Sequence, residues 1–357
     1  MKILITGACG FVGSALALAL RERREGLEIV GMDNFLRPGS EMNRGRLARS
    51  GVRVVHGDVR LASDWQELPR ADWVIDAAAN PSVLAGLDGK GSARQLLENN
   101  LWGGVEGLEY CRRHGAGLIV LSSSRVYSLG ALARLPLVER GQAFTLDTAG
   151  GLPDGLSGEG IGVSFSTVPP LSLYGASKRA FELLALEYAN AFRLPVWVNR
   201  CGVMAGAGQF GTPDQGILSF WIHAHARRAP LKYLGFGGHG YQVRDALHPR
   251  DLAALIDAQI HSSRISGQRT YTVGGGRNNS ISLRQLTLWC DSRFGTHPVA
   301  ADGRERPFDL PWVVMDSGDA AQDFDWRNET GIESILEEIA CHAETHHDWL
   351  ELSGWKA

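Results

Sequence analysis

The amino-acid sequence predicts an α/β fold: a doubly wound parallel sheet with a smaller, mostly C-terminal α/β lobe for the substrate. Three observations lead to this prediction. A short apolar run at the start is followed by a glycine-rich turn and an apolar helical pattern. Further short apolar runs alternate with helical patterns as far as about residue 200. Polar residues follow these runs directly, and ligands of parallel sheets bind at the carboxyl ends of the strands.

Bulk composition excludes several classes of protein. The 357 residues are 44% hydrophobic and 21% charged, with a formal net charge of -3, so nothing indicates a nucleic-acid partner. The five cysteines are an odd number without a CxxC pair, which argues against a disulfide framework or a zinc site. No long apolar run is present, so we expect no membrane span and a cytoplasmic protein in a reducing compartment.

The glycine-rich turn carries Gly7, Gly10 and Gly13, between a strand at residues 2–6 and a helix from residue 14 to about 24. Glycines in this setting let backbone amides at a helix N-terminus approach a pyrophosphate. We therefore predict a Rossmann-type dinucleotide-binding turn. The alternative is a merely tight turn between strand and helix.

The second strand, residues 27–32, is followed by Asp33 and Asn34. A carboxylate at this position accepts hydrogen bonds from both ribose hydroxyls of an adenosine and repels a 2′-phosphate. NAD is therefore predicted as the cofactor rather than NADP. A third strand, residues 52–56, is followed by Asp58, which we expect either to bind the adenine amino group or to cap the strand end.

The fourth strand, residues 73–75, ends at Asp76 and three alanines, residues 77–79, which allow the backbone to pass close to a cofactor. One long helix is expected at about residues 93–114, with Asn100 inside it. This regular alternation of strands and helices is typical of a parallel, doubly wound sheet.

A fully apolar strand at residues 118–121 leads into a serine cluster, which the carboxyl end of the strand places near a substrate. Residues 128–170 are rich in Gly, Pro and Leu without a clear period. We expect them to cover the substrate, because so long a connection is usually functional or mobile. A further strand at residues 195–199 ends at Arg200.

Beyond residue 200 the regular alternation stops. We expect residues 1–200 to form the NAD-binding Rossmann domain, with added segments near residues 243–273. Residues 201–357 are expected to form the substrate-binding lobe, with Ser282 as the N-cap of one helix and a final amphipathic helix at about residues 332–352.

Tyr174 and Lys178 are four residues apart at the start of an apolar-periodic helix, so they lie on the same face. A phenol, with an ordinary pKa of about 10, is a poor base at neutral pH, and a neighbouring ammonium group favours its ionised form. The pair therefore predicts a base that takes a proton from an alcohol. Because ordinary solvated helix faces show the same spacing, the other motifs decide between the two interpretations.

Several motifs together resemble the extended short-chain dehydrogenase/reductase family of nucleotide-sugar enzymes. They are residues 6–13, Asp33-Asn34, Asp58-Val59, Ser123 with Tyr127, Tyr174-x-x-x-Lys178 and Arg306-Pro307-Phe308-Asp309. The likeness extends over nearly the whole chain. It implies an NAD-dependent enzyme whose substrate is a nucleoside-diphosphate sugar.

The resemblance implies a role for each matching residue. Tyr174 is the expected base, Lys178 its electrostatic partner and Ser123 the donor to the substrate oxygen. Residues expected at the cofactor are Gly7, Gly10, Phe11, Val12, Gly13, Asp33, Asn34, Asp58, Val59, Ala77, Ala78, Ala79, Asn100, Ser122, Tyr174, Lys178 and Arg200. Residues expected at the substrate are Ser124, Arg125, Gln215, Arg244 and Arg306. The last two match diphosphate-binding positions, with a surface ion pair as the alternative for each.

Within the family, four segments resemble the epimerases that act at C2 of a CDP-linked hexose. These are the glycine turn with Cys9 and residues 214–216, 242–248 and 274–283. The likeness favours a CDP-hexose as the substrate and partner of this protein.

Departures from the family pattern narrow the reaction. Ser124 and Arg125 stand where the dehydratases carry an Asp-Glu pair, and Arg125 stands where similar decarboxylases carry Glu. No additional Cys-His acid/base pair for an enolate mechanism is evident at the motif positions. Asp76 replaces a common His, Phe308 a Gly and Val203 an Asn, and the last change puts in doubt any substrate contact inferred from 4-epimerases.

We therefore expect a redox epimerase that oxidises the sugar transiently to a keto-sugar with tightly held NAD and returns the hydride to the opposite face. Three alternatives stay open. They are another nucleotide-sugar epimerase or dehydrogenase of the family, such as a 4-epimerase of UDP-glucose, an alcohol dehydrogenase that releases NADH, and a non-catalytic NAD-binding protein. We expect a homodimer or homotetramer, with a dimer formed through the two long helices beside the active strand.

Histidine spacing gives one metal signal. His342 and His346 are at i and i+4 on the final helix, a spacing that can bind a metal ion. No carboxylate cluster accompanies them, so we expect a solvated helix face and no metal site. His223 and His225 are expected to serve packing.

Overall fold

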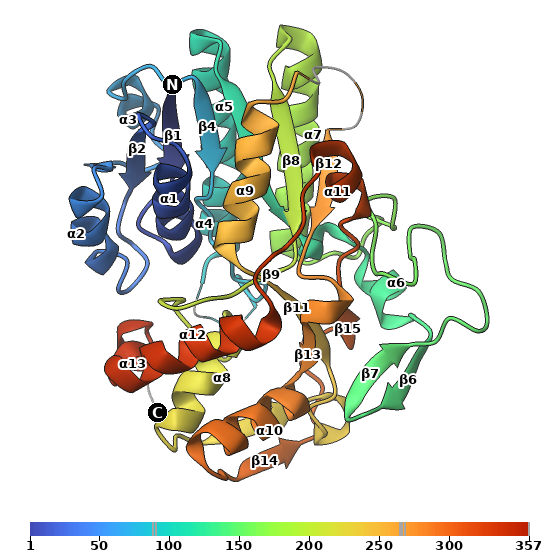
Figure 1. The fold of residues 1–357 in the computed structure, drawn as a ribbon. Coiled ribbons are helices and arrows are strands. Elements are labelled where there is room, and N and C mark those ends of the chain that lie inside the picture. The colour runs from blue at the N-terminus through green and yellow to red at the C-terminus, as the bar shows by residue number, and fades with distance from the viewer. Residues whose placement is uncertain (88, 90, 264–266, 268, 356–357) are drawn as a thin grey trace.

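The computed structural model describes residues 1–357 apart from 88, 90, 264–266, 268 and 356–357. Its largest sheet has seven strands in the order β12-β8-β5-β4-β1-β2-β3, and every neighbouring pair is parallel (Figure 1). The strands are β1 (Lys2–Thr6), β2 (Glu28–Asp33), β3 (Arg53–His56), β4 (Trp73–Asp76), β5 (Gly117–Ser123), β8 (Val196–Cys201) and β12 (Thr270–Val273). The doubly wound parallel sheet expected from the sequence is confirmed.

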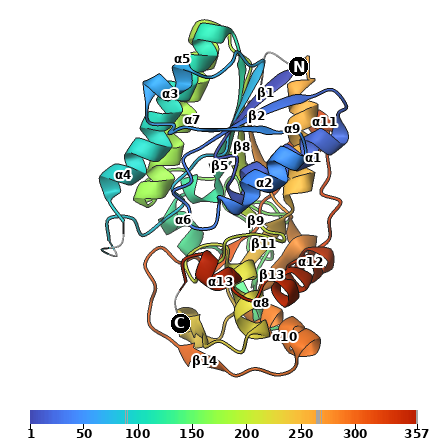
Figure 2. The same cartoon turned by 90° about the vertical axis from the view of Figure 1, so that its left-hand side faces the viewer.

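Side chains that alternate along the strands build two apolar cores, one on each face of the sheet. On β1, Ile3 and Ile5 belong to one core and Leu4 to the other, and all three are fully buried. Helices cover both faces, as the edge-on view of the sheet shows (Figure 2). The first core includes α1 (Phe11–Arg23), α9 (Pro249–Ile260) and α11 (Gly318–Phe324), and the second includes α5 (Gly103–His114) and α7 (Leu173–Phe192).

The first helix and the expected long helix differ from the sequence predictions. Helix α1 begins at Phe11, three residues earlier than predicted, because Gly10 already has the extended backbone of an N-cap. The helix expected at residues 93–114 consists of α4 (Ala93–Leu97), a π-helical turn η1 (Glu98–Trp102) and α5. Such single π-turns widen a helix locally and are frequent at functional sites.

Residues 128–170, which the sequence led us to expect over the substrate, are partly structured. They contain α6 (Leu129–Ala133) and a hairpin of β6 (Leu137–Arg140) and β7 (Ala143–Leu146). The hairpin is fixed to the smaller lobe, because the Phe144 amide donates to the Tyr241 carbonyl over 2.9 Å. No residue of this segment lines either of the two cavities described below.

The smaller lobe contains two further sheets. A four-stranded sheet joins β9 (Val203–Met204), β11 (Val243–Leu247), β13 (Ser280–Ser282) and β15 (Trp312–Val313), and β10 (Leu231–Leu234) pairs with β14 (Val299–Asp302). Its helices are α8 (Ile217–Ala226), α10 (Leu283–Phe294), α12 (Ile332–Thr345) and α13 (Trp349–Leu352). The remaining elements are α2 (Met42–Arg49), α3 (Ala62–Gln66) and the 3-10 turns η2 (Ser124–Val126), η3 (Phe236–Gly238) and η4 (Arg277–Asn279).

Two sequence predictions for this lobe have different outcomes. Ser282 caps α10 with a reciprocal capping box, in which its hydroxyl accepts from the Gln285 amide and the Gln285 side chain accepts from the Ser282 amide. The single terminal helix predicted at residues 332–352 is instead two helices, α12 and α13, separated by three residues. None of the helices in the described part of the chain is long and apolar enough to cross a membrane.

The chain passes between the two lobes more than once after residue 200. Strand β11 lies in the small sheet, whereas α9 and β12, which follow it, join the large sheet and its core. We therefore propose that the dinucleotide-binding domain consists of about residues 1–200 with added segments from the C-terminal part, including α11.

Candidate active site

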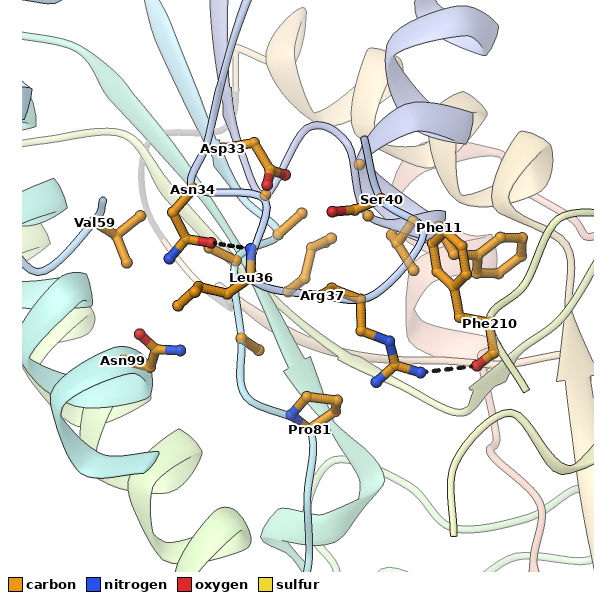
Figure 3. Close-up of a pocket in the computed structure, with 18 of the residues that line it drawn as sticks. Phe11, Asp33, Asn34, Leu36, Arg37, Ser40, Val59, Pro81, Asn99 and Phe210 are labelled. Atoms are coloured by element: carbon orange, nitrogen blue, oxygen red, sulfur yellow. Dashed lines mark hydrogen bonds between the residues drawn. The ribbon is translucent and has the colours of Figure 1, made fainter. Parts of the chain in front are cut away.

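A cavity of about 350 Å³ opens at the carboxyl ends of β1, β2, β4 and β5 (Figure 3). Polar and small residues from all four strand ends meet in its wall, as expected for an open parallel sheet. Of the residues predicted to bind the cofactor, those lining it are Gly7, Gly10, Phe11, Val12, Gly13, Asp33, Asn34, Val59, Ala77, Ala78, Ala79, Ser122, Tyr174 and Lys178. Asp58, Asn100 and Arg200 do not line it.

The glycine turn forms a cradle that has no room for side chains. Gly7 has a φ of +63°, and a Cβ there would lie 2.8 Å from the Ala78 Cα atom. A Cβ on Gly13 would lie 2.2 Å from the Gly7 carbonyl oxygen. The turn therefore packs backbone against backbone and directs the N-terminus of α1 at the cavity, which suits the pyrophosphate of a dinucleotide.

Asp33 is held in a fixed position at the end of β2. One carboxylate oxygen accepts from the Cys9 amide and the other from the Phe35 amide, both over 2.8 Å. Burial, with a further contribution from this carboxylate, raises the pKa of the Cys9 thiol to about 12, so Cys9 stays neutral. Each oxygen of Asp33 keeps a free lone pair toward the cavity, and this donor-free carboxylate fits the ribose hydroxyls of NAD.

Asp58 has local partners instead of an open place in the cavity wall. Its carboxylate forms an ion pair with Arg60 over 2.6 Å and accepts from the Asn34 amide group over 3.1 Å. The Arg60 guanidinium group is the main cause that lowers the pKa of Asp58 to about 2. The sequence left open whether Asp58 binds the adenine amino group or caps the end of the strand. The geometry favours the cap.

The π-helical turn exchanges the roles of two neighbouring asparagines. Asn100 is 2% exposed, and its side chain accepts from the Asn80 amide over 2.7 Å and donates to the Ser177 hydroxyl. Asn99 lines the cavity instead, and its buried side-chain oxygen has no partner among the described residues. On the grounds of this position, we propose that Asn99 rather than Asn100 contacts the cofactor.

Arg200 points away from the cavity and into the protein. Its guanidinium group forms a two-pronged ion pair with Glu182, the shortest contact being 2.8 Å, and lies 5.2 Å from the centre of the Tyr127 ring. Glu182 is fully buried and also accepts from the Ser122 hydroxyl over 2.5 Å. Because Arg200 compensates this buried charge, it is not available to a cofactor in the way that the sequence suggested.

Helix α7 carries the predicted base and its partner to the cavity. The Ser172 hydroxyl caps the helix by accepting from the Gly175 amide over 3.1 Å, and Tyr174 lies in the first turn. Lys178, one turn later, is 3% exposed and donates to the Leu121 carbonyl over 3.1 Å. Both side chains line the cavity, so the helix face predicted from the sequence is directed at a ligand site rather than at solvent.

Ser123 is the last residue of β5. Its side-chain oxygen accepts from the Arg125 amide over 3.2 Å, which leaves the hydroxyl hydrogen free to donate. Ser122 lines the cofactor cavity and Arg125 lines a second cavity, so Ser123 lies in the chain between the two without lining either.

Asp76, the departure from the family pattern at the end of β4, is held beneath the site. It accepts from the Thr6 hydroxyl over 2.9 Å. Burial raises the pKa of this carboxyl group, whereas the positive charge of Lys178 and the Thr6 bond act in the opposite direction. Asp76 therefore interacts electrostatically with Lys178, the expected partner of the base.

The second cavity, of about 160 Å³, adjoins the first and shares Gln215 and Gly216 with it. Three guanidinium groups line it, those of Arg125, Arg244 and Arg306, as expected for the diphosphate of a substrate. Gln215, also predicted at the substrate, is in the wall, whereas Ser124 is buried and does not line it.

Neighbouring oxygen atoms hold the three arginines of this second cavity in position, but the positive charges of the arginines repel one another. Arg125 donates to the Phe308 carbonyl over 2.8 Å, and Arg244 pairs with Asp309 over 3.1 Å. Burial, followed by the charge of Arg244, lowers the pKa of Arg125 to about 10. Arg306 pairs with Asp214. Three positive groups against two carboxylates leave an excess of positive charge that favours an anion.

Polar residues of the cavity walls that sequence reasoning missed, besides Asn99, include Arg37, Ser40 and Gln242. Arg37 and Ser40, on the loop after β2, line the first cavity, and Gln242 lines the second with an unpartnered, buried side-chain oxygen. Their signal was weak, because a polar residue in a loop or an edge strand is usually solvated. Only their position after a strand's carboxyl end could have marked the first two.

The histidines form a packed group. His342 is not on a solvated face: its Nδ1 lies 3.1 Å from Nε2 of His223, and its ring stacks on that of His346 at 4.0 Å. Burial is the main cause that lowers the pKa of His223 to about 4 and that of His342 to about 3. Within the described residues, no group of three or more His, Cys, Asp or Glu side chains is arranged to hold a metal ion.

The fold and the cradle define the class of protein: a dinucleotide-binding α/β enzyme with an adjoining cavity that three arginines line. Residues 3–274 match the NAD dependent epimerase/dehydratase family. A CDP-paratose 2-epimerase of Salmonella typhi is 31% identical over 313 residues, which are 84% of this chain and 88% of that protein. A UDP-glucose 4-epimerase of Erwinia amylovora is 30% identical over 94% of this chain and 96% of that protein. The chain belongs to the NAD dependent epimerase/dehydratase family, and NAD is its cofactor.

Solved structures agree with this assignment at the level of the fold. Pal from Bacillus thuringiensis superposes with a TM-score of 0.77 at 22% identity, over 97% of this chain and 99% of that chain. UDP-glucuronic acid 4-epimerase from Bacillus cereus, in complex with UDP-glucuronic acid and NAD, has a TM-score of 0.74 at 23% identity over the same shares.

Proposed function

We propose that this protein epimerises a nucleotide sugar, most favourably at C2 of a CDP-linked hexose, by transient oxidation and reduction. The observation that carries the proposal is the pair of adjoining cavities. Tyr174 and Lys178 line the first, three arginines line the second, and Gln215 belongs to both walls. A sugar whose diphosphate binds the arginines therefore extends toward the base.

In the proposed reaction, Tyr174 in its ionised form removes the proton from a sugar hydroxyl. Lys178, on the next turn of α7, stabilises the phenolate, and its bond to the Leu121 carbonyl fixes its position. Ser123 donates its free hydroxyl hydrogen to the same sugar oxygen. NAD, when bound, supplies reversible hydride exchange with the sugar carbon. Reprotonation of the oxygen by Tyr174, after the keto-sugar has turned its other face, completes the cycle without net redox change.

The residues around Ser123 favour epimerisation over elimination. A dehydratase of this family needs an acid and a base directly after the serine, and this chain has Ser124 and Arg125 there. Ser124 is a buried residue of the turn η2, and Arg125, which lines the second cavity, donates to the Phe308 carbonyl. Neither group is a carboxylate that could expel water from the sugar.

The preference for CDP rests on the segments that resemble the C2 epimerases and on the 31% identity to a CDP-paratose 2-epimerase. A UDP-sugar 4-epimerase is the second candidate, since relatives of that activity are similar to this chain over comparable lengths. Val203, in the wall of the second cavity, replaces the asparagine of many relatives and favours the first candidate.

The test is to incubate the purified protein with CDP-, UDP-, GDP- and dTDP-hexoses in deuterium oxide and to follow new epimers by NMR. We expect conversion of a CDP-hexose, without added NAD and without deuterium at carbon. Deuterium incorporation would indicate an enolate mechanism, and accumulation of NADH with an oxidised sugar would indicate a dehydrogenase. Tyr174→Phe is the control. A variant that keeps full turnover would exclude Tyr174 as the base.

We further propose a homodimer formed through α4, η1, α5 and α7. Helices α5 and α7 pack against each other on one face of the sheet. The surrounding elements expose large apolar side chains: Leu97 of α4 at 39%, Trp102 of η1 at 54%, and Leu183 and Phe192 of α7 at 51% and 47%. Burying such residues in a symmetric helical interface removes them from water. A cytoplasmic location is also proposed, and the five free cysteines, four of them buried, suit a reducing compartment.

A further inference from the structure

The loop that follows β2 joins the two lobes across the mouth of the first cavity. Arg37, on this loop, donates to the side-chain oxygen of Gln215 over 2.7 Å and to the Phe210 carbonyl over 3.0 Å. Its guanidinium carbon also lies 5.8 Å from the centre of the Phe210 ring. Figure 3 shows the side chain extending from the loop toward Phe210, with its charged end in the cavity. One arginine of the dinucleotide domain thus binds two residues of the substrate side.

The charge of Arg37 has no counter-charge among the residues that the structure describes. Both acceptors are neutral, and no carboxylate among the described residues lies within 4.0 Å of the guanidinium group. Burial alone lowers the pKa of Arg37. A partly buried cation without a neighbouring anion is energetically unfavourable. An anionic ligand in the cavity would supply the missing counter-charge beside Arg37.

Ser40 on the same loop supports this interpretation independently. Its hydroxyl group is fully buried in the wall of the cavity and has no hydrogen-bond partner in the described part of the chain. A free hydroxyl donor and a guanidinium group without a counter-charge therefore face the space in front of the glycine cradle. Phosphate oxygens satisfy both kinds of donor.

We propose that Arg37 is a clasp that binds a phosphate of the dinucleotide and fastens the substrate lobe over it through Gln215 and Phe210. This rests on the proposed function only in that NAD stays bound between turnovers. The diphosphate is the expected ligand rather than a 2′-phosphate, because the Asp33 carboxylate stands at the ribose position and repels added negative charge.

The clasp has a consequence for the order of events. Gln215 lines both cavities, so the residue that positions Arg37 is also in contact with the space for the substrate. Loss of the clasp therefore loosens the cofactor first. The catalytic pair on α7 stays in place, because within the described part of the chain Lys178 is held by the Leu121 carbonyl and the start of the helix by Ser172, and neither belongs to this loop.

The test compares Arg37→Met with Arg49→Met, which removes the same charge from an exposed residue at the end of α2. Bound NAD is quantified after purification, and its dissociation rate is measured by exchange with labelled NAD in the absence of any sugar. We expect Arg37→Met to release NAD about tenfold faster or more and Arg37→Lys to fall between it and the wild type, with Arg49→Met unchanged. Gly39 lies so close to the Phe210 ring that a Cβ there would be 2.8 Å from a ring carbon. This contact between the loop and the lobe remains in the Arg37→Met variant.

A dissociation rate of Arg37→Met within about twofold of the wild type would overturn the clasp, since charge-assisted bonds to phosphate contribute more than that. A lower ratio of NADP to NAD affinity in Arg37→Met, with unchanged NAD affinity, would overturn it as well, because Arg37 would then act on a 2′-phosphate and not on the diphosphate. A double variant with Gln215→Leu should release NAD no faster than Arg37→Met alone if the two residues act as one unit. Because the exchange experiment contains no sugar, a fast release of NAD by Arg37→Met supports the clasp even if the protein converts no sugar. A wild-type release rate in Arg37→Met overturns the clasp even if epimerisation is found.

Discussion

Gly175 and the carbonyl group of Arg125 are in direct backbone contact. A Cβ on Gly175 would lie 2.1 Å from the Arg125 carbonyl oxygen, a distance that real Cβ atoms do not tolerate. The first turn of α7 therefore rests on the turn after β5 without an intervening side chain. This contact joins the element that carries the base to the element that carries the hydroxyl donor and a substrate arginine.

Replacing Gly175 by alanine should separate these two elements. We expect Gly175→Ala to lose about 1–3 kcal/mol of unfolding free energy and about tenfold or more in kcat, because the helix must shift relative to β5. Urea unfolding and steady-state kinetics measure the two effects. Gly45→Ala, in exposed helix α2 with ordinary space around its Cβ, is the matched control and should gain about 0.5–1 kcal/mol. If the two variants changed the unfolding free energy and kcat equally, the result would contradict the importance of this backbone contact.

Asp33 should determine the choice of dinucleotide. Asp33→Asn removes the negative charge that repels a 2′-phosphate, so the ratio of NADP to NAD affinity should rise by about tenfold or more. Calorimetric titration of the cofactor-free protein measures both affinities. Asp154→Asn, an exposed carboxylate outside the cavity, makes the same change in net charge and should leave the ratio as it is. An unchanged ratio of the two affinities in Asp33→Asn would contradict the placement of this carboxylate beside the ribose.

Glu182 is expected to be a structural residue whose loss leaves buried groups without partners. Glu182→Gln breaks the ion pair with Arg200 and disturbs the bond from Ser122, so it should cost about 3–5 kcal/mol of stability. Chemical denaturation measures this loss. Glu187→Gln, on the exposed side of the same helix, should change stability by less than about 0.5 kcal/mol. If Glu182→Gln is as stable as the wild type, then Arg200 has another partner.

Acid should destabilise the smaller lobe through the paired histidines. Burial is the main cause that depresses the pKa of His223 to about 4 and that of His342 to about 3 in the folded protein, from an ordinary value of 6.5. An unfolded chain takes up these protons first, so the stabilisation is complete above pH 6.5 and is lost as the pH falls toward about 4. Denaturation midpoints across this window should fall more steeply for the wild type than for His342→Gln. His347→Gln, at an exposed position, should follow the wild type.

Local sequence patterns were sufficient for the elements of the large sheet. The apolar runs that became β1, β2, β4 and β5 alternate in a period of two or are apolar throughout, and their flanking glycines and polar residues mark the ends. Cavity residues that follow a strand end directly, such as Asp33 and Ala78, were therefore placed correctly in relation to the cavity. The boundary errors were about one to three residues, as at Phe11, because caps depend on backbone angles that many sequences allow.

The structure differs from the sequence expectations where a distant part of the chain competes for a side chain. Arg200 follows a strand and has the chemistry of a phosphate ligand, but Glu182 from α7 takes its charge. Likewise, the π-turn shifts the helix by one residue and exchanges Asn100 for Asn99 in the cavity wall. His342 was expected in solvent, although His223 from α8 covers it.

The sequence by itself determined the fold class, the glycine cradle and the Tyr174–Lys178 pair, because each depends on residues that are close along the chain and obey a fixed period. Only the tertiary structure decided which charges remain free for a ligand. Arg37, Arg125 and Arg200 look alike in the sequence, but the first two lack a full counter-charge and the third is neutralised by Glu182. The physical reason is that a charge is available or compensated according to what lies within a few ångströms of it in space, and those neighbours come from distant segments.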